Sequence, residues 1–309
     1  MSAIHLPRVL WCADSGPPRD LDVETDIHPL IDWSGFDCDA FAGRLPKNAA
    51  AADVQMVRVR TGEARGFLVE GGEHFTVSQA FDPAHAVRLL SDLVPNPWVA
   101  REIVGKVEAS LVEKGFDEAL IGTLEGFIVD ELRRSLAGWR DARSKDIFMH
   151  ELDAGHIQFR LRGDGTNWPM PSHVYSSAAP APLLIDAMRP PEKSMFLPVF
   201  AADLNPDEAR AAVYLDKASA VKWWHRNSVG GEGYALRGWR RGRVFVDFLF
   251  AAANGHERIV AMETKGDQLA LNLDTAYKEE LLRMLSKAFR IEAASGAGLP
   301  FEPVGEFDA

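Results

Sequence analysis

Hydrophobic residues change their spacing along the first two-thirds of the chain. Residues 1–80 show short alternating runs broken by Gly and Pro, which predicts short strands and loops, with strand-like runs at 54–60 and 66–77. From residue 82 the apolar residues recur every three or four positions, a spacing typical of amphipathic helices. We expect helices over 83–93, 98–114 and 117–152.

Capping residues support these helices. Asp117 is the expected N-cap of the long helix, and Gly115 is placed to end the helix before it. A strand over 156–162 follows, and then a stretch rich in Pro and Ser over 168–191 that predicts a connector.

The last third predicts a helix, a run of strands and a second helix. Asn205 is the expected N-cap, with Pro at the next position, of a helix that ends near residue 217. Asn254-Gly255 predicts a tight hairpin between two later strands, and the last helix spans 274–289. Strands are expected over 221–227, 234–240, 243–252 and 257–265.

Charged residues interrupt two of these apolar strands. Asp247 lies in a run that is apolar on both faces, and Glu263 and Lys265 share one face of the next strand. Burying an ionised carboxylate costs several kcal/mol unless it is paired or bound to a metal. Adjacent strands would bring the two carboxylates together, which suits Mg²⁺, with the lysine positioning the attacking water. A structural ion pair between Asp247 and Lys265 is the alternative, since an acidic-x-Lys triplet alone occurs by chance.

Glu208 has two interpretations of equal weight. It stands at the third helical position after Asn205, where it predicts a capping box. It also shares a helical face with Ala212 and Leu215, so it is a candidate third acidic residue facing the sheet and the metal.

Composition and charge add one feature to this picture. The 309 residues carry 34 Lys and Arg against 45 Asp and Glu, a net charge of −11, which disfavours wholesale coating of nucleic acid. Residues 217–243 reverse that balance with seven Lys or Arg and one acidic residue, interleaved with Trp and Tyr. This reversal suits a surface that contacts phosphates, and solvated strand edges around an aromatic core are the alternative.

Several classes of protein are disfavoured. No apolar run approaches the roughly 20 residues that span a bilayer, and no signal peptide is evident at the start. The two cysteines form no C-x-x-C pair, and no phosphate-binding loop of the G-x-x-x-x-G-K-[ST] type occurs. We therefore expect a cytoplasmic protein with no membrane partner and no ATP site in this chain.

An ordered string of motifs resembles the C-terminal PD-(D/E)xK endonuclease domain of the Res subunits of type III restriction enzymes. In order, the motifs are Asn205-x-x-Glu208, Val213-Tyr214-Leu215-Asp216, Trp223-Trp224-His225-Arg226-Asn227, Gly238-Trp239-Arg240, Val246-Asp247-Phe248 and Glu263-Thr264-Lys265-Gly266. The upstream part is similar to the segment between helicase and nuclease in that family, through Leu6-Pro7-Arg8, Ile31-Asp32-Trp33, Val94-Pro95-Asn96-Pro97-Trp98, Arg160-x-Arg162 and Asn167-Trp168.

The resemblance implies an α/β fold and a domain organisation. Residues 200–292 are expected to form a restriction-endonuclease-like mixed sheet flanked by helices, followed by a tail over 293–309. Residues 1–199 are expected to form a post-helicase connector region, β-rich over 1–80, helical over 82–152, with a strand and connector over 156–199.

The resemblance also implies an activity, the cleavage of DNA phosphodiesters with Mg²⁺, for which Mn²⁺ can substitute. Asp247 and Glu263 match the family's metal carboxylates, Lys265 its catalytic lysine and Glu208 the acidic residue of its first helix. Val246 stands where the motif has proline. The expected DNA-binding residues are Arg226, Arg237, Arg240, Arg241 and Lys278.

The expected partners are DNA, a helicase region, which this chain lacks, and a DNA methyltransferase subunit. Two alternatives stay open. One is a non-catalytic DNA-binding or subunit-docking module that keeps the nuclease fold, and the other is a nuclease that acts on RNA or single strands.

Overall fold

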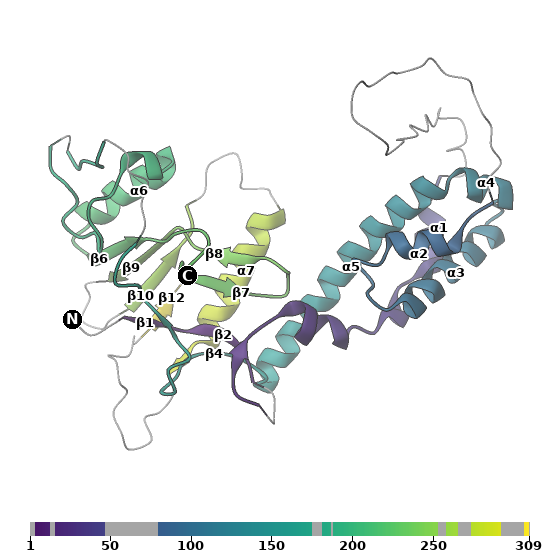
Figure 1. Ribbon diagram of the computed structural model, residues 1–309, viewed down its shortest axis with the longest axis horizontal. Helices are drawn as coiled ribbons and strands as arrows, with labels where there is room; N and C mark the ends of the chain where they lie inside the picture. The colour runs from purple at the N-terminus through teal and green to yellow at the C-terminus, as the bar shows by residue number, and fades with distance from the viewer. Residues whose placement is uncertain are drawn as a thin grey trace, which may run out of the picture. The chain divides into compact units, whose positions relative to one another are not determined.

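The chain folds as a mixed α/β protein, and its helices and strands form two compact units (Figure 1). The computed structural model describes residues 4–12, 16–46, 80–174, 181–186, 188–252, 258–264, 273–291 and 306–308. One unit consists of Met1–Leu30 with Ser144–Ala309, and the other of Ile31–Arg143. None of the described helices is both long enough and apolar enough to cross a membrane.

The unit Ile31–Arg143 is a helical bundle with its own core. Its helices are α1 (Cys38–Arg44), α2 (Pro83–Leu89), α3 (Pro97–Glu113), α4 (Glu118–Thr123) and the first part of α5 (Glu125–Ala154). Asp117 caps α4 by accepting a hydrogen bond from the Leu120 amide, and Gly115 has the positive φ that the end of α3 requires. The long helix expected over 117–152 is interrupted at Leu124, which leaves the helical conformation and separates α4 from α5.

The other unit contains two four-stranded sheets. The first has the order β11-β4-β2-β3, and its strand β4 confirms the strand expected over 156–162. A short pair, β1 with β5, lies apart from it. The bounds are β1 (His5–Leu6), β2 (Arg8–Trp11), β3 (Arg19–Asp20), β4 (Ile157–Leu161), β5 (Trp168–Pro169) and β11 (Arg290–Ile291).

The second sheet contains the strands of the C-terminal third, in the order β12-β10-β9-β6. Its neighbours pair antiparallel except β12, which runs parallel to β10. Helix α6 (Pro206–Lys217) precedes it in the chain, and α7 (Leu273–Ala288) follows β10. The bounds are β6 (Val221–Arg226), β9 (Phe248–Ala252), β10 (Arg258–Met262) and β12 (Glu306–Asp308), beside a separate hairpin of β7 (Ala235–Arg237) and β8 (Arg243–Phe245).

The structure corrects two strand predictions. The single strand expected over 243–252 is two strands, because the chain leaves the β8 hairpin at Val246 and Asp247 before it enters the larger sheet as β9. The strand expected over 257–265 ends at Met262. The Asn254-Gly255 turn lies outside the described residues, as do the strands expected at 54–60 and 66–77.

The second sheet lies between α6 and α7 (Figure 1). Phe248 on β9 and Trp224 on β6 pack in one core with Ala212 and Leu215 of α6. The alternate residues of the same strands form the other face. Leu249, Ile259 and Ala261 pack in a second core with residues of α7 such as Tyr277 and Leu281.

The domain boundary expected at residue 200 does not separate compact units. Leu6 of β1 and Phe159 of β4 share one core with Leu249 of β9 and with Leu281 of α7. The two sheets therefore form one folding unit, and the helical bundle is inserted into it between residues 30 and 144. Within the expected tail, β12 adds an edge strand to the second sheet.

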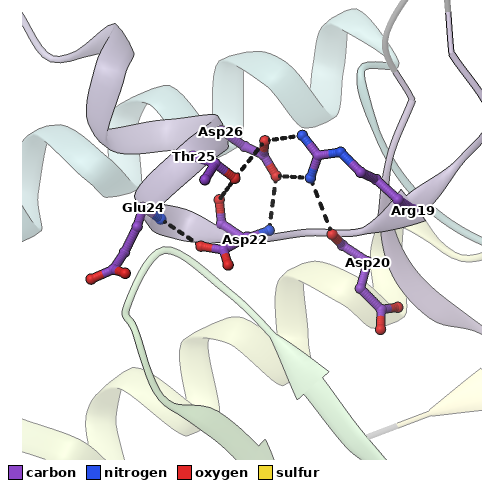
Figure 2. Close-up of polar contacts among 6 residues, drawn as sticks. All are labelled: Arg19, Asp20, Asp22, Glu24, Thr25 and Asp26. Atoms are coloured by element: carbon purple, nitrogen blue, oxygen red, sulfur yellow. Dashed lines mark hydrogen bonds and ion pairs between the residues drawn. The ribbon is translucent and has the colours of Figure 1, made fainter.

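An ion pair between an exposed arginine and a buried aspartate stabilises the N-terminal part of this unit (Figure 2). Arg19 donates from both terminal nitrogens to the Asp26 carboxylate, whose side chain is 1% exposed. The same carboxylate accepts from the Asp22 amide at 2.8 Å and from the Thr25 hydroxyl at 3.2 Å. These bonds satisfy a buried charge that would otherwise cost several kcal/mol, and they hold the helical turn whose Ile27 enters the core.

Candidate functional site

Asp247 lies at the point where the ends of three strands are tied together. Its amide donates to the Met262 carbonyl of β10 at 3.0 Å, and its carbonyl accepts from the Asn227 amide, just after β6, at 2.8 Å. The backbone of Asp247 is thus bonded to both neighbouring strands, although the residue itself lies between β8 and β9. Its side chain projects from a half-buried position at this end of the sheet.

Asn227 holds the segment between β8 and β9 in place. Its side-chain amide donates to the carbonyls of Tyr234 and Val246 at 2.8 and 2.9 Å, and its oxygen accepts from the Tyr234 amide at 2.8 Å. The residue is 2% exposed. An asparagine directly after a strand is common in sequences, so nothing in the pattern identified this one as the residue that positions Asp247.

Glu263 and Thr264 follow β10, and Thr264 contacts the Asp247 side chain. The Thr264 amide and hydroxyl both donate to Asp247 Oδ2, each at 2.6 Å. Glu263 Oε1 accepts from Lys278 Nζ of α7 at 2.6 Å, whereas Glu263 Oε2 is buried and has no hydrogen-bond partner among the described residues. Asp247 is close enough to Glu263 for its charge to act on that carboxylate, and Lys278 of α7 binds Glu263 directly.

Burial and neighbouring charges shift the pKa values of Glu263 and Lys278. Burial raises the pKa of Glu263, and the charge of Asp247 raises it further, while the hydrogen bond from Lys278 acts in the opposite direction. Burial works against the charge of Lys278, but its hydrogen bond to Glu263 and the charges of Glu263, Asp274 and Asp247 outweigh burial and raise its pKa. Lys278 is accordingly a cation that faces carboxylates.

Lys265 and Glu208 are the two remaining catalytic candidates from the sequence. Lys265 lies outside the described residues. Glu208 is part of the capping box of α6, where its Oε2 accepts from the Asn205 amide at 2.8 Å, and its Oε1 accepts from Arg226 at 3.3 Å. Among the described residues, Glu208 does not join Asp247 and Glu263 in a group that could hold a metal ion. The capping-box interpretation is confirmed, and the structure does not bring Glu208 to the carboxylate pair.

Most of the basic residues expected to bind DNA have partners within the chain. Lys278 is bound to Glu263 and Arg226 to Glu208, as described above. Arg240 stacks over the Tyr277 ring at 4.6 Å, and Arg241 forms an ion pair with Glu24 at 2.5 Å. Arg237 lies on β7 directly opposite Arg243 of β8.

The chemistry that this site offers is that of a carboxylate pair with an adjacent ammonium group. Among the described residues no group of three or more His, Cys, Asp or Glu side chains could hold a metal ion. Asp247 and Glu263 therefore offer at most two protein carboxylates. That number matches Mg²⁺, which is commonly bound through one or two carboxylates together with waters and phosphate oxygens.

Comparison with known proteins identified no similar protein. No family model, no curated protein and no solved structure matches the chain.

Proposed function

We propose that the chain carries a Mg²⁺-dependent DNA endonuclease site of the PD-(D/E)xK type. The observation that carries this proposal is Glu263 Oε2, a buried carboxylate oxygen to which no described residue donates a hydrogen bond. Glu263 is also close enough to Asp247 for the charge of Asp247 to raise its pKa. A buried charged oxygen is costly unless a cation or a donor meets it. A divalent ion shared with Asp247 would satisfy it.

The residues present fit a magnesium ion. Asp247 and Glu263 would hold it through Oδ1 and Oε2, the oxygens to which no described residue donates a hydrogen bond. When bound, Mg²⁺ supplies positive charge at a phosphate and lowers the pKa of a coordinated water. Lys278 favours the charged form of Glu263, and Lys265 is proposed as the lysine that positions the attacking water.

The arrangement of the sheet supports this proposal. The pair lies at the ends of adjacent strands, in a sheet with α6 on one face and α7 on the other. This is the helix-sheet-helix order that the resemblance to type III Res subunits implies. We further propose that the chain acts in the cytoplasm with a helicase region and a methyltransferase subunit. Arg237, Arg240 and Arg241 are the proposed contacts to DNA phosphates.

A non-catalytic module is the second candidate function. The ion pair between Lys278 and Glu263 favours it, because the lysine neutralises one carboxylate without any metal. A protein that only binds DNA or a partner subunit would retain such an ion pair for its contribution to stability.

Cleavage of supercoiled plasmid by the purified chain tests the proposal. We expect nicking that requires Mg²⁺ or Mn²⁺ and that disappears in Asp247→Asn and Glu263→Gln. Asp207→Asn is the matched control, because this carboxylate lies in the first turn of α6 and pairs with Arg210. DNA binding without cleavage, with or without added helicase and methyltransferase, would favour the non-catalytic module. Cleavage that survives both substitutions would place the active site elsewhere.

A further inference from the structure

We infer that Thr264 is a positioning residue for Asp247, and that its hydroxyl sets the divalent-cation affinity of the site. This inference rests on the proposed function. Thr264 lies between Glu263 and Lys265 in the sequence, and no sequence pattern predicted a role for it.

Both donors of Thr264 converge on one oxygen. The amide and the hydroxyl each lie 2.6 Å from Asp247 Oδ2, and these are the hydrogen bonds that the structure gives the Asp247 carboxylate. An aspartate has two rotatable side-chain bonds, and a single donor leaves the carboxylate free to swing about its axis. Two donors that meet at Oδ2 restrain the carboxylate more than one donor would, and thereby limit where Oδ1 can lie.

The end of β10 makes this contact possible. In a continued strand, Thr264 and Glu263 would point to opposite faces of the sheet. The strand stops at Met262, whose carbonyl accepts the Asp247 amide at 3.0 Å, so the next two residues are released from that alternation. Glu263 and the Thr264 hydroxyl can then both approach Asp247.

Glu263 is held in a parallel manner. Its Oε1 is bound to Lys278 at 2.6 Å, and its buried Oε2 has no partner in the described part of the chain. Each carboxylate thus has one oxygen bound to the chain. Groups that orient metal ligands in this way typically change metal affinity about 10- to 100-fold when they are removed.

The test compares Thr264→Val with Thr264→Ser. Valine keeps the shape and the backbone amide but removes the hydroxyl, whereas serine keeps the hydroxyl and loses only the methyl group. Mn²⁺ binding is measured by isothermal titration calorimetry, and plasmid cleavage is measured against Mn²⁺ concentration. We expect Thr264→Val to bind Mn²⁺ about 10-fold more weakly and to recover cleavage at high Mn²⁺. Thr264→Ser should bind Mn²⁺ and cleave plasmid as the wild type does.

The failures of this inference and of the proposed function are distinguishable. If Thr264→Val binds Mn²⁺ as the wild type does while Asp247→Ala does not bind it, the inference is wrong and the metal site stands. If the wild type shows no Mn²⁺ binding that depends on Asp247, the proposed function and the inference fall together. Thermal unfolding reports whether the variants fold, and Thr264→Ala replaces the valine variant if the latter does not.

Discussion

Acidification should destabilise the protein through His225. This histidine of β6 is 4% exposed, and its ring packs edge-on against Phe196 with the ring centroids 5.1 Å apart. Burial, and then the charge of Arg226, lower its pKa from 6.5 to about 4. The folded protein therefore keeps His225 neutral under conditions in which the unfolded chain takes up a proton.

The size of the effect follows from the difference in pKa. The contribution is fully present above about pH 6.5 and is lost as the pH falls toward about 4. A pH of about 5 lies roughly 1.5 units below the pKa of the unfolded chain, so protonation there stabilises the unfolded state by about 2 kcal/mol. The loss approaches about 3 kcal/mol below pH 4. This is a large share of the roughly 5–15 kcal/mol by which a typical domain is stable.

Urea unfolding followed by tryptophan fluorescence, at about pH 7.5 and about pH 5, measures this effect. His225→Phe keeps a ring against Phe196 but does not titrate, so its free energy of unfolding should fall about 2 kcal/mol less than that of the wild type over this range. His150→Gln is the control, because it replaces a histidine whose side chain is 78% exposed. Equal pH dependence in His225→Phe and the wild type would refute the reasoning.

Three further predictions concern the two helices beside the sheet, each measured as the free energy of unfolding in urea. Glu208→Ala removes the capping box and an ion pair, so it should cost about 1–3 kcal/mol while leaving Mn²⁺ affinity unchanged. Lys278→Met removes the donor to a largely buried Glu263 and should also cost about 1–3 kcal/mol, with a smaller loss when Glu263→Gln is combined with it. Gly238→Ala would place its Cβ 2.5 Å from the Tyr277 hydroxyl and should cost about 1–3 kcal/mol by overpacking.

Each of these predictions has an outcome that contradicts it. Weaker Mn²⁺ binding in Glu208→Ala would return this residue to the metal site. Additive losses for Lys278 and Glu263 would mean that their ion pair contributes nothing to stability. An unchanged free energy of unfolding in Gly238→Ala would show that α7 can shift away from the loop after β7.

Elements defined by neighbouring residues were predictable from the sequence. Asn205 and Asp117 begin helices and Gly115 ends one as expected, because a cap is made by residues a few positions apart. The strands at 156–162 and 221–227 were also found, since alternation of apolar residues is a local pattern. Helix α1 was missed in a region that its composition presented as strands and loops.

The candidate site was predictable only in part. The sequence shows Asp247 and Glu263 as charges within apolar runs, and the cost of burying a charge predicts that they have partners. Which residues those partners are was decided by the tertiary structure. Lys278 reaches Glu263 from another helix, and Thr264 reaches Asp247 because β10 stops early. Such contacts join residues about 15 to 17 positions apart, and only the packing of helix against sheet selects them, because hydrophobic periodicity specifies faces and not the ends of strands.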